Sequence, residues 1–323
     1  PMINADVYNK LILAGRQTHQ QMREKGLTGR LPGRNVVPGL MTYFSELGYG
    51  SLPNLVENNE AFAQTGNPIV PAAEYHRRLA DQHRQVLEES GFDRIYSDLE
   101  RFCRGTQRIH GRANKRMIEA VRVNPNVKGY CVHALTAGDW IMGAGLLDLW
   151  RNPKEYVYQQ TKEANQPRLV SIRVRPRNVY GGDPARIAIK GVNEKEAFGG
   201  HLEVQVKDHK GETVFRDEKQ VNLEARINEL YEHNLDTRAL EGQYRVEARL
   251  VDDQGRRITQ NDFPFHVYDR KQLVVPEADL AVLDPDNVLK PFLDKKGMAF
   301  EDFDADTPLS LPVLVARTHA RNQ

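Results

Sequence analysis

The sequence predicts a multidomain protein in which α/β segments flank an all-β segment, and three observations lead to this prediction. The chain has 323 residues, about twice the usual length of one domain. Helical and strand-like apolar patterns alternate up to about residue 150, whereas residues 167–268 alternate apolar and polar side chains with a period of two. We therefore expect three domains, over residues 1–155, 165–269 and 270–323.

The first segment, residues 1–155, combines helices with two short apolar strands. Apolar residues recur at helical spacing over residues 4–25, 72–89 and 102–121. The runs 39–45 and 127–135 are short and apolar, which is typical of strands buried on both faces, and the first of them ends at Glu46. A further helix is expected by Trp150. This alternation of helices and strands predicts a parallel sheet.

The second segment, residues 165–269, predicts an immunoglobulin-like β-sandwich. Period-two alternation is clearest at 187–189, 202–206, 244–250 and 263–267. The stretches 208–211 (DHKG) and 252–255 (DDQG) separate such runs as hairpin turns, and a length of about a hundred residues is typical of a two-sheet sandwich. Residues 270–323 then begin a further α/β domain, with strands at 279–283 and 312–316 and a helix over 286–296.

Composition excludes several classes of function. Forty-five Lys and Arg against 44 Asp and Glu leave a net charge of +1, which argues against a nucleic-acid partner. No run of 18 apolar residues is present, so we expect a soluble protein without a membrane partner. Neither HExxH, a P-loop nor GxGxxG occurs, so no metal or cofactor is expected. Cys103 and Cys131 have apolar neighbours that predict buried thiols, and they do not indicate a compartment.

The segment from Tyr43 to Pro53 (YFSELGYGSLP) is the most informative for chemistry. It leads from an apolar strand to a single carboxylate, Glu46, and then into a Gly-rich turn. The carboxyl ends of strands line the active cleft in barrels and doubly wound sheets, so a carboxylate there can approach a substrate from a fixed backbone. From the pattern alone, a Glu just past a strand is more often a solvated turn residue or a partner for a nearby arginine.

Two stretches resemble a known enzyme family. Residues 45–53 (SELGYGSLP) resemble the nucleophile segment on the seventh strand of glycoside hydrolase family 2, the β-galactosidase, β-glucuronidase and β-mannosidase group. Residues 129–140 (GYCVHALTAGDW), then 145–148 (GLLD) and 151–154 (RNPK), are similar to that family's eighth strand and the segment that leaves its barrel. The resemblance covers residues 1 to 270 and implies that residues 1–155 are the C-terminal part of a TIM (β/α)8 barrel.

The resemblance also implies a reaction, the retaining hydrolysis of β-linked sugars with Glu46 as nucleophile. In that mechanism one ionised carboxylate attacks the anomeric carbon and a second, about 5–5.5 Å away, acts as acid and then base. Tyr43 and Tyr49 flank Glu46 as candidate substrate contacts or packing residues. His133 stands where the family commonly has a Trp beneath the sugar ring, and a core histidine is an equally good interpretation. Trp140 is a candidate substitute for that Trp or a buried rim residue.

The sequence departs from the family at the acid/base residue, which belongs on an earlier strand after an Asn. The Asn-Glu pairs of this chain all follow Glu46, and none fits that position: 59–60, 193–194 and 228–229. The chain begins at Pro1, which indicates a cut start. We therefore expect a fragment that is inactive by itself. Besides a β-linked carbohydrate substrate, its expected partner is a missing N-terminal half or a second copy in a homo-oligomer. The alternative is a non-catalytic carbohydrate-binding or scaffold fragment.

Overall fold

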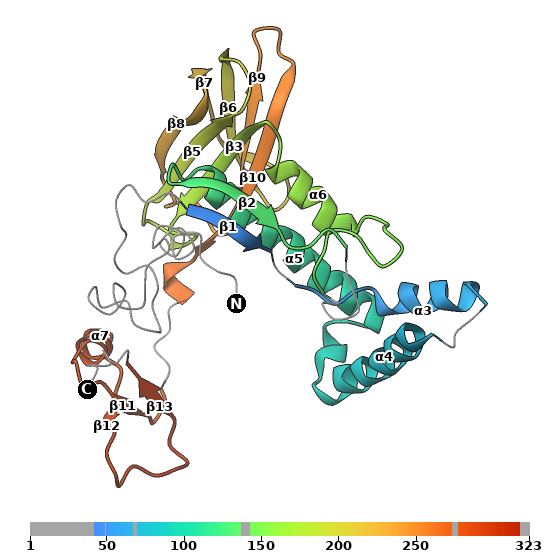
Figure 1. Cartoon of the computed structure of the whole chain (residues 1–323). Helices are drawn as coiled ribbons and strands as arrows, with labels where there is room; N and C mark the ends of the chain where they lie inside the picture. The colour runs from blue at the N-terminus through green and yellow to red at the C-terminus, as the bar shows by residue number, and fades with distance from the viewer. Residues whose placement is uncertain (1–41, 49, 67–69, 137–142, 273–276, 317–323) are drawn as a thin grey trace, which may run out of the picture.

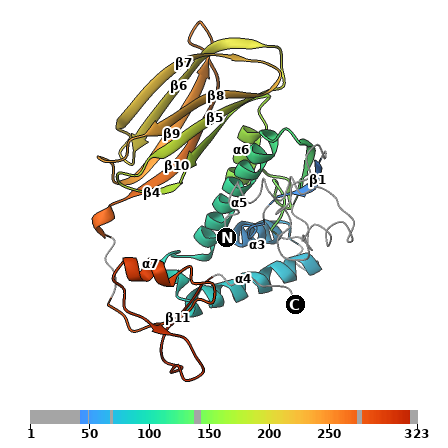
Figure 2. The ribbon, with the colours of Figure 1, turned by 90° about the vertical axis from the view of Figure 1, so that its left-hand side faces the viewer.

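The structure is a computed structural model that describes residues 42–316 except 49, 67–69, 137–142 and 273–276 (Figure 1). The helix expected over residues 4–25 and the start of the run 39–45 lie outside the described residues. The described chain is rich in sheet. A small α/β unit comes first, a two-sheet sandwich follows, and a short α/β unit comes last (Figures 1 and 2).

The first unit is built around one pair of parallel strands, as the alternating pattern predicted. Strands β1 and β2 pair in parallel, and α5 packs against both of them and against α6. The buried side chains between these elements include Leu47, Ile118 and Val121. The elements of the unit are β1 (Thr42–Leu47), α3 (Leu55–Gln64), α4 (Pro71–Glu89), a 3-10 turn (Phe92–Arg94), α5 (Leu99–Arg122), β2 (Val127–Val132) and α6 (Glu155–Ala164).

Side-chain caps fix where helices α3 and α5 begin. The carboxylate of Asp98 accepts the backbone N–H of Arg101 at 2.8 Å, which satisfies one unpaired amide of the first turn of α5. The side chain of Asn54 accepts the amide of Glu57 in the same way at the start of α3. Helix α5 ends just before Asn124-Pro125, where the sequence predicted its stop.

Two expectations for this unit were wrong. Neither strand is buried on both faces: in β1 Tyr43 is 64% exposed and Ser45 and Glu46 are also exposed, and in β2 no residue is fully buried and Lys128 and Cys131 are exposed. The helix expected by Trp150 is absent from described residues 143–150, because the Asp148 carboxylate accepts the amides of Trp150 (2.9 Å) and Asn152 (2.7 Å) and closes a turn there. The next helix is α6, which begins only at Glu155.

Residues 168–268 form a sandwich of two sheets. One sheet has the strand order β3-β5-β8 and the other β4-β10-β9-β6-β7, and all neighbouring strands are antiparallel except β4 and β10. Strand β7, at one edge, is exposed along most of its length. The strands are β3 (Arg168–Arg175), β4 (Asn178–Tyr180), β5 (Ala185–Asn193), β6 (Phe198–Asp208), β7 (Thr213–Leu223), β8 (Arg226–Leu235), β9 (Gly242–Val251) and β10 (Arg257–Tyr268).

The period-two prediction is confirmed in the core between the two sheets. Ile187 and Ile189 of β5 face Leu202, Val204 and other apolar residues of β6 and β9, and all are fully buried. Phe263 is only half-buried and lies at the margin of this core. The turns at 208–211 and 252–255 are hairpins as expected, and each ends in a glycine with positive φ.

The last unit is a three-stranded parallel sheet with one short helix. Its elements are β11 (Ala281–Leu283), α7 (Lys290–Lys295), β12 (Glu301–Asp302) and β13 (Val313–Val315), in the sheet order β12-β11-β13, after a 3-10 turn (Arg270–Gln272). The helix is shorter than the predicted 286–296, because the Asp284 carboxylate accepts the amides of Leu289 and Lys290 and holds the preceding residues in a turn. No helix in the described part of the chain is long and apolar enough to cross a membrane.

One buried carboxylate joins the first unit to the sandwich. Glu119 of α5 is 3% exposed. It accepts a hydrogen bond from Asn261 of β10 at 2.8 Å and forms an ion pair with Arg173 of β3 at 3.3 Å. The side chain of Asn261 also donates to the carbonyl of Val170 at 2.7 Å. Helix α5 and the sandwich are therefore connected by polar contacts that exclude water.

Candidate functional site

The candidate nucleophile lies on a β-bulge near the end of β1. Phe44 pairs with Tyr130 and Leu47 pairs with Val132, so three steps along β1 correspond to two along β2. The extra residue lets both Ser45 and Glu46 face solvent, while Leu47 is fully buried in the core beneath them. Bulges commonly redirect side chains in this way next to active sites. Strand β1 ends at Leu47, which is one residue beyond the end predicted at Glu46.

The ends of β1 and β2 meet closely. The amide of His133 donates to the carbonyl of Leu47 at 2.8 Å. Gly48 lies directly against the backbone carbonyl of His133, and a Cβ at this glycine would overlap that oxygen. A side chain at position 48 would therefore push the two strand ends apart. No described residue forms an ion pair with Glu46, so the arginine-bound interpretation has no support among the described residues.

Partly buried polar contacts hold the turn that follows Glu46. The hydroxyl of Ser51 lies 3.0 Å from Nδ1 of His110, and the Ser51 amide donates to the carbonyl of Gly143 at 3.0 Å. The Leu52 amide donates to the hydroxyl of Thr106 at 3.1 Å. These contacts connect the turn to α5 and to the segment after β2. The backbone that leaves β1 is consequently fixed from both sides.

Two titratable groups behind this turn have strongly shifted pKa values. His110 is fully buried, and burial, with a smaller contribution from the positive charge of Lys154, lowers its pKa to about 3. Lys154 is 5% exposed and donates to the carbonyls of Ala144 (3.0 Å) and Gly143 (3.3 Å). Burial lowers the pKa of Lys154 to about 8, and the carboxylate of Asp148 partly opposes this shift. His110 is therefore neutral near pH 7, whereas most of the Lys154 side chains remain charged.

The other predicted site residues lie in different surroundings. The ring of Tyr43 covers Gly129 of β2, where a Cβ would lie 2.9 Å from ring atoms, so Tyr43 packs on the neighbouring strand. His133 is half-buried just beyond β2 and beside Leu47. Tyr49 and Trp140 lie outside the described residues. The structure thus brings the end of β2 next to the strand that carries Glu46.

The two cysteines differ from each other. Cys103 is fully buried on α5, as predicted, and burial raises its pKa to about 11. Cys131 is exposed on β2, so the prediction of a buried thiol was wrong there. Its side chain points away from the side of β2 that packs on α5, where Tyr130 and Val132 contact the core. Among the described residues, no cluster of three or more His, Cys, Asp or Glu is placed to hold a metal ion.

Sequence reasoning missed the residues that support the turn. Ser51 and His110 are 59 positions apart, and Lys154 lies on a different segment again. No local pattern connects them, because only the packing of α5 beneath the strands brings them together. The sole signal in the sequence is the occurrence of a histidine within the apolar pattern of a long helix.

Comparisons with known proteins find structural relatives but no sequence relatives. No protein-family model matches the chain, and no curated protein matches its sequence. A β-D-mannosidase from Dictyoglomus thermophilum is similar in structure, with a TM-score of 0.52 and 21% identity over 78% of this chain and 29% of the mannosidase. The described fold is therefore shared with part of a β-mannosidase, and this chain spans less than a third of that enzyme.

Other solved structures give weaker matches. An exo-chitosanase from Amycolatopsis orientalis has a TM-score of 0.43 and 17% identity over 53% of this chain and 20% of its own. A β-glucuronidase from glycoside hydrolase family 2 has a TM-score of 0.25 and 17% identity over 30% of this chain and 11% of its own. Both of these TM-scores lie below 0.5, so the likeness in fold rests on the mannosidase.

Proposed function

We propose that this chain is part of a retaining β-glycosidase related to glycoside hydrolase family 2, with Glu46 as its nucleophile. The observation that carries the proposal is the bulge in β1, which exposes Glu46 at the carboxyl end of a strand whose parallel neighbour ends beside it. The shared fold with part of a β-mannosidase supports the same assignment. An exposed carboxylate at the end of a strand is accessible to a substrate, as attack on an anomeric carbon requires.

The proposal assigns roles to the residues around Glu46. The contacts of Ser51 and of the Leu52 amide fix the backbone that follows the nucleophile, which keeps the carboxylate in place during attack. His133 at the end of β2, with Tyr49 and Trp140, would contact the bound sugar. Tyr43 would support the strand from below, since its ring lies over the neighbouring backbone.

The proposal places the acid/base carboxylate outside the described residues. The Asn-Glu pairs of this chain lie in α3, at the end of β5 and in β8, and none is next to the end of β1. The partner carboxylate would then come from a longer polypeptide or a separate chain. By itself, the chain would be inactive. The proposed substrates are β-linked sugars.

We also infer the domain assignment that this function requires. Residues 1–155 would be the C-terminal part of a TIM barrel, supported by the parallel pairing of β1 with β2 across the connecting helices. Residues 165–269 would be an immunoglobulin-like sandwich, supported by its two sheets of three and five strands. Residues 270–323 would begin a further α/β domain, supported by the parallel order β12-β11-β13.

The test is an assay of a polypeptide that also contains the remaining barrel strands, with p-nitrophenyl β-mannoside, β-galactoside and β-glucuronide as substrates. Replacing Glu46 by Gln should lower kcat by about a thousandfold or more while the circular dichroism spectrum stays unchanged. Azide should partly restore turnover to Glu46→Ala and yield the α-glycosyl azide, which only loss of a nucleophile explains. Glu60→Gln, an exposed carboxylate on α3, is the matched control and should retain activity.

Two results would contradict this assignment. Full activity of Glu46→Gln would exclude Glu46 as the nucleophile. Binding of the same sugars in isothermal titration, without turnover by the complete polypeptide, would favour a non-catalytic carbohydrate-binding or scaffold protein instead. That second function is favoured by one observation, the absence of an Asn-Glu pair beside the end of β1 among the described residues.

A further inference from the structure

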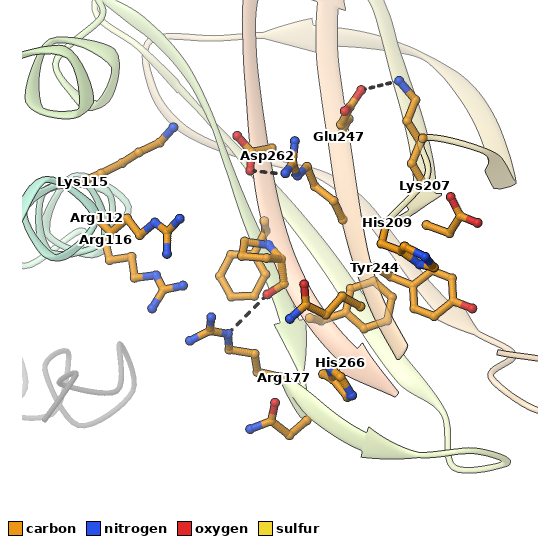
Figure 3. Close-up of a pocket in the computed structure, with 18 of the residues that line it drawn as sticks. Arg112, Lys115, Arg116, Arg177, Lys207, His209, Tyr244, Glu247, Asp262 and His266 are labelled. Atoms are coloured by element: carbon orange, nitrogen blue, oxygen red, sulfur yellow. Dashed lines mark hydrogen bonds and ion pairs between the residues drawn. The ribbon is translucent and has the colours of Figure 1, made fainter. Parts of the chain in front are cut away.

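A broad groove runs between helix α5 and the five-stranded sheet, away from the candidate nucleophile. Its volume is about 700 Å³, within the usual range of ligand sites. Its walls come from α5 and α6 on one side and from β4, β9, β10 and the β6–β7 turn on the other (Figure 3). None of its lining residues belongs to β1, β2 or the turn after Glu46.

The groove is lined with cationic side chains in excess over anionic ones. Seven Lys and Arg face four Asp and Glu, although the whole chain has a net charge of only +1. Arg112, Lys115 and Arg116 come from α5, and the other cations are Arg177, Lys207, Lys210 and Arg245. Positive charge is therefore concentrated at this place on a nearly neutral protein.

Two of the four carboxylates are paired with cations of the same wall. Glu247 accepts a hydrogen bond from Lys207 at 2.7 Å, and Asp262 lies 3.7 Å from Arg245 (Figure 3). Each of these pairs is approximately neutral. They remove two cations and two anions from the charge that a ligand would meet, and Lys115 is likewise paired, with Glu163 of α6 at 2.9 Å.

The remaining two carboxylates are occupied by other contacts. Glu119 is buried and bound to Arg173 and Asn261. Asp208 accepts the backbone amides of Lys210 (2.9 Å) and Glu212 (2.8 Å) within its own hairpin turn. Three further arginines line the groove, and the charge of Glu119 partly opposes that of one of them, Arg116.

Those three arginines are Arg112, Arg116 and Arg177, and they lie close together. Arg112 and Arg116 are one turn apart on the same face of α5, and Arg177 lies opposite them just before β4 (Figure 3). The guanidinium groups of Arg116 and Arg177 both lie over the ring of Phe263, at 5.8 and 6.0 Å from its centre. Arg112 is exposed, and no described residue forms a hydrogen bond or ion pair with it.

The mutual repulsion of these arginines contributes to the lowered pKa values of Arg116 and Arg177. Burial, followed by the positive charges of Arg177 and Arg112, lowers the pKa of Arg116 to about 10. Burial and Arg112 also lower the pKa of Arg177. Like charges held together in this way bind a polyanion more strongly than separate arginines do, because the anion relieves the repulsion and accepts several hydrogen bonds.

We propose that this groove binds a ligand with at least two oxyanion groups, phosphate or sulfate, and that Arg112, Arg116 and Arg177 are its principal contacts. Planar guanidinium groups match the oxygens of such groups in pairs. The groove volume of about 700 Å³ is large enough for more than one of them. This inference is independent of the proposed glycosidase function, since it concerns other residues and requires no turnover.

The test is isothermal titration of the whole chain at low salt with three probes: inorganic phosphate, pyrophosphate and a heparin-derived sulfated disaccharide. Pyrophosphate or the disaccharide should bind at least tenfold more tightly than phosphate, and added NaCl should weaken this binding. Preference for pyrophosphate assigns the groove to a phosphorylated ligand, and preference for the disaccharide assigns it to a sulfated sugar. Binding of none of the three probes overturns the proposal.

Variants locate the binding. Arg112→Gln, together with Arg177→Gln, should raise the Kd for the preferred probe at least tenfold. The matched control is Arg84→Gln with Arg101→Gln, which removes the same charge from exposed positions of α4 and α5 outside the groove. An equal loss in this control would show non-specific attraction and refute the site.

A second measurement avoids any dependence on folding of the double variant. Phenylglyoxal modifies exposed arginines, and mass spectrometry can follow Arg112 and Arg101 in the unmutated chain. The preferred probe should slow modification of Arg112 several-fold and leave Arg101 unchanged. Equal rates with and without the probe at Arg112 would overturn the proposal.

Discussion

Replacing Glu119 by Ala should strongly destabilise the protein, because this carboxylate is the buried link between α5 and the sandwich. The substitution removes its ion pair with Arg173, whose side chain is 14% exposed, and its hydrogen bond from Asn261. Removing one partner of a buried pair costs about 3–5 kcal/mol. Arg173 retains a hydrogen bond to the Ile172 carbonyl at 2.8 Å, so we expect the lower end, about 3 kcal/mol.

Glu119→Gln should cost less, about 1–2 kcal/mol, because the amide oxygen still accepts the hydrogen bond from Asn261 while the charge opposite Arg173 is lost. Arg173 is sensitive to this loss, since its Nη2 atom is already buried without a hydrogen bond in the described structure. The ranking of the two variants tests the role of the charge separately from that of the hydrogen bond.

Urea unfolding measures both variants with two probes. Both tryptophans, Trp140 and Trp150, precede the sandwich in the chain, so their fluorescence reports on the first unit, whereas far-ultraviolet circular dichroism includes the sandwich. Glu232→Ala is the control, because Glu232 forms an exposed pair with Arg186 and should change stability by less than about 0.5 kcal/mol. If Glu119→Ala shifts the midpoint no more than Glu232→Ala, the assignment of Glu119 as a structural link is wrong.

Three further predictions concern the region around the candidate site. Below about pH 6.5 the unfolded chain protonates His110, whereas the folded chain does so only near pH 3. The free energy of unfolding should therefore fall as the pH is lowered between these values, by up to about 1.4 kcal/mol per pH unit. Urea unfolding of His110→Asn should show a shallower fall. Ellman's reagent should modify Cys131 in the native protein and Cys103 only in denaturant. Gly48→Ala should cost about 1–3 kcal/mol in thermal or urea unfolding by separating the ends of β1 and β2, whereas Gly50→Ala, with no atom near its added Cβ, should be nearly neutral.

Each of these three has a result that would contradict it. An unchanged pH dependence in His110→Asn would mean that other groups control acid sensitivity. Reaction of two thiols in the native protein would mean that α5 opens readily around Cys103. Equal stability of the two glycine variants would mean that the strand ends are loosely packed.

Regular local patterns predicted most of the sandwich correctly. Alternation of side chains identified the inward-facing residues, such as Ile187 and Leu202, because successive residues of a strand point to opposite faces whatever surrounds them. The hairpins also followed from local chemistry, since a turn that needs positive φ selects glycine, as at Gly211 and Gly255.

Features set by contacts between distant residues could not be predicted in the same way. The bulge in β1 depends on its register with β2, more than eighty residues later, so the exposure of Ser45 was not visible in an apolar run. Glu119 and Asn261 are 142 positions apart, and nothing near either of them indicates the other. For the candidate site, the sequence pointed to Glu46 through a likeness to known enzymes, whereas its supporting contacts required the packing of α5.

The two outer strands of the five-stranded sheet have a consequence for behaviour at high concentration. Strand β4 has only three residues, and β7 presents a run of four charged residues, Arg216 to Lys219, at the opposite edge. A second molecule adding sideways to either edge would gain few backbone hydrogen bonds or would have to strip water from charged groups. Lateral growth into fibrils is thus disfavoured at this sheet.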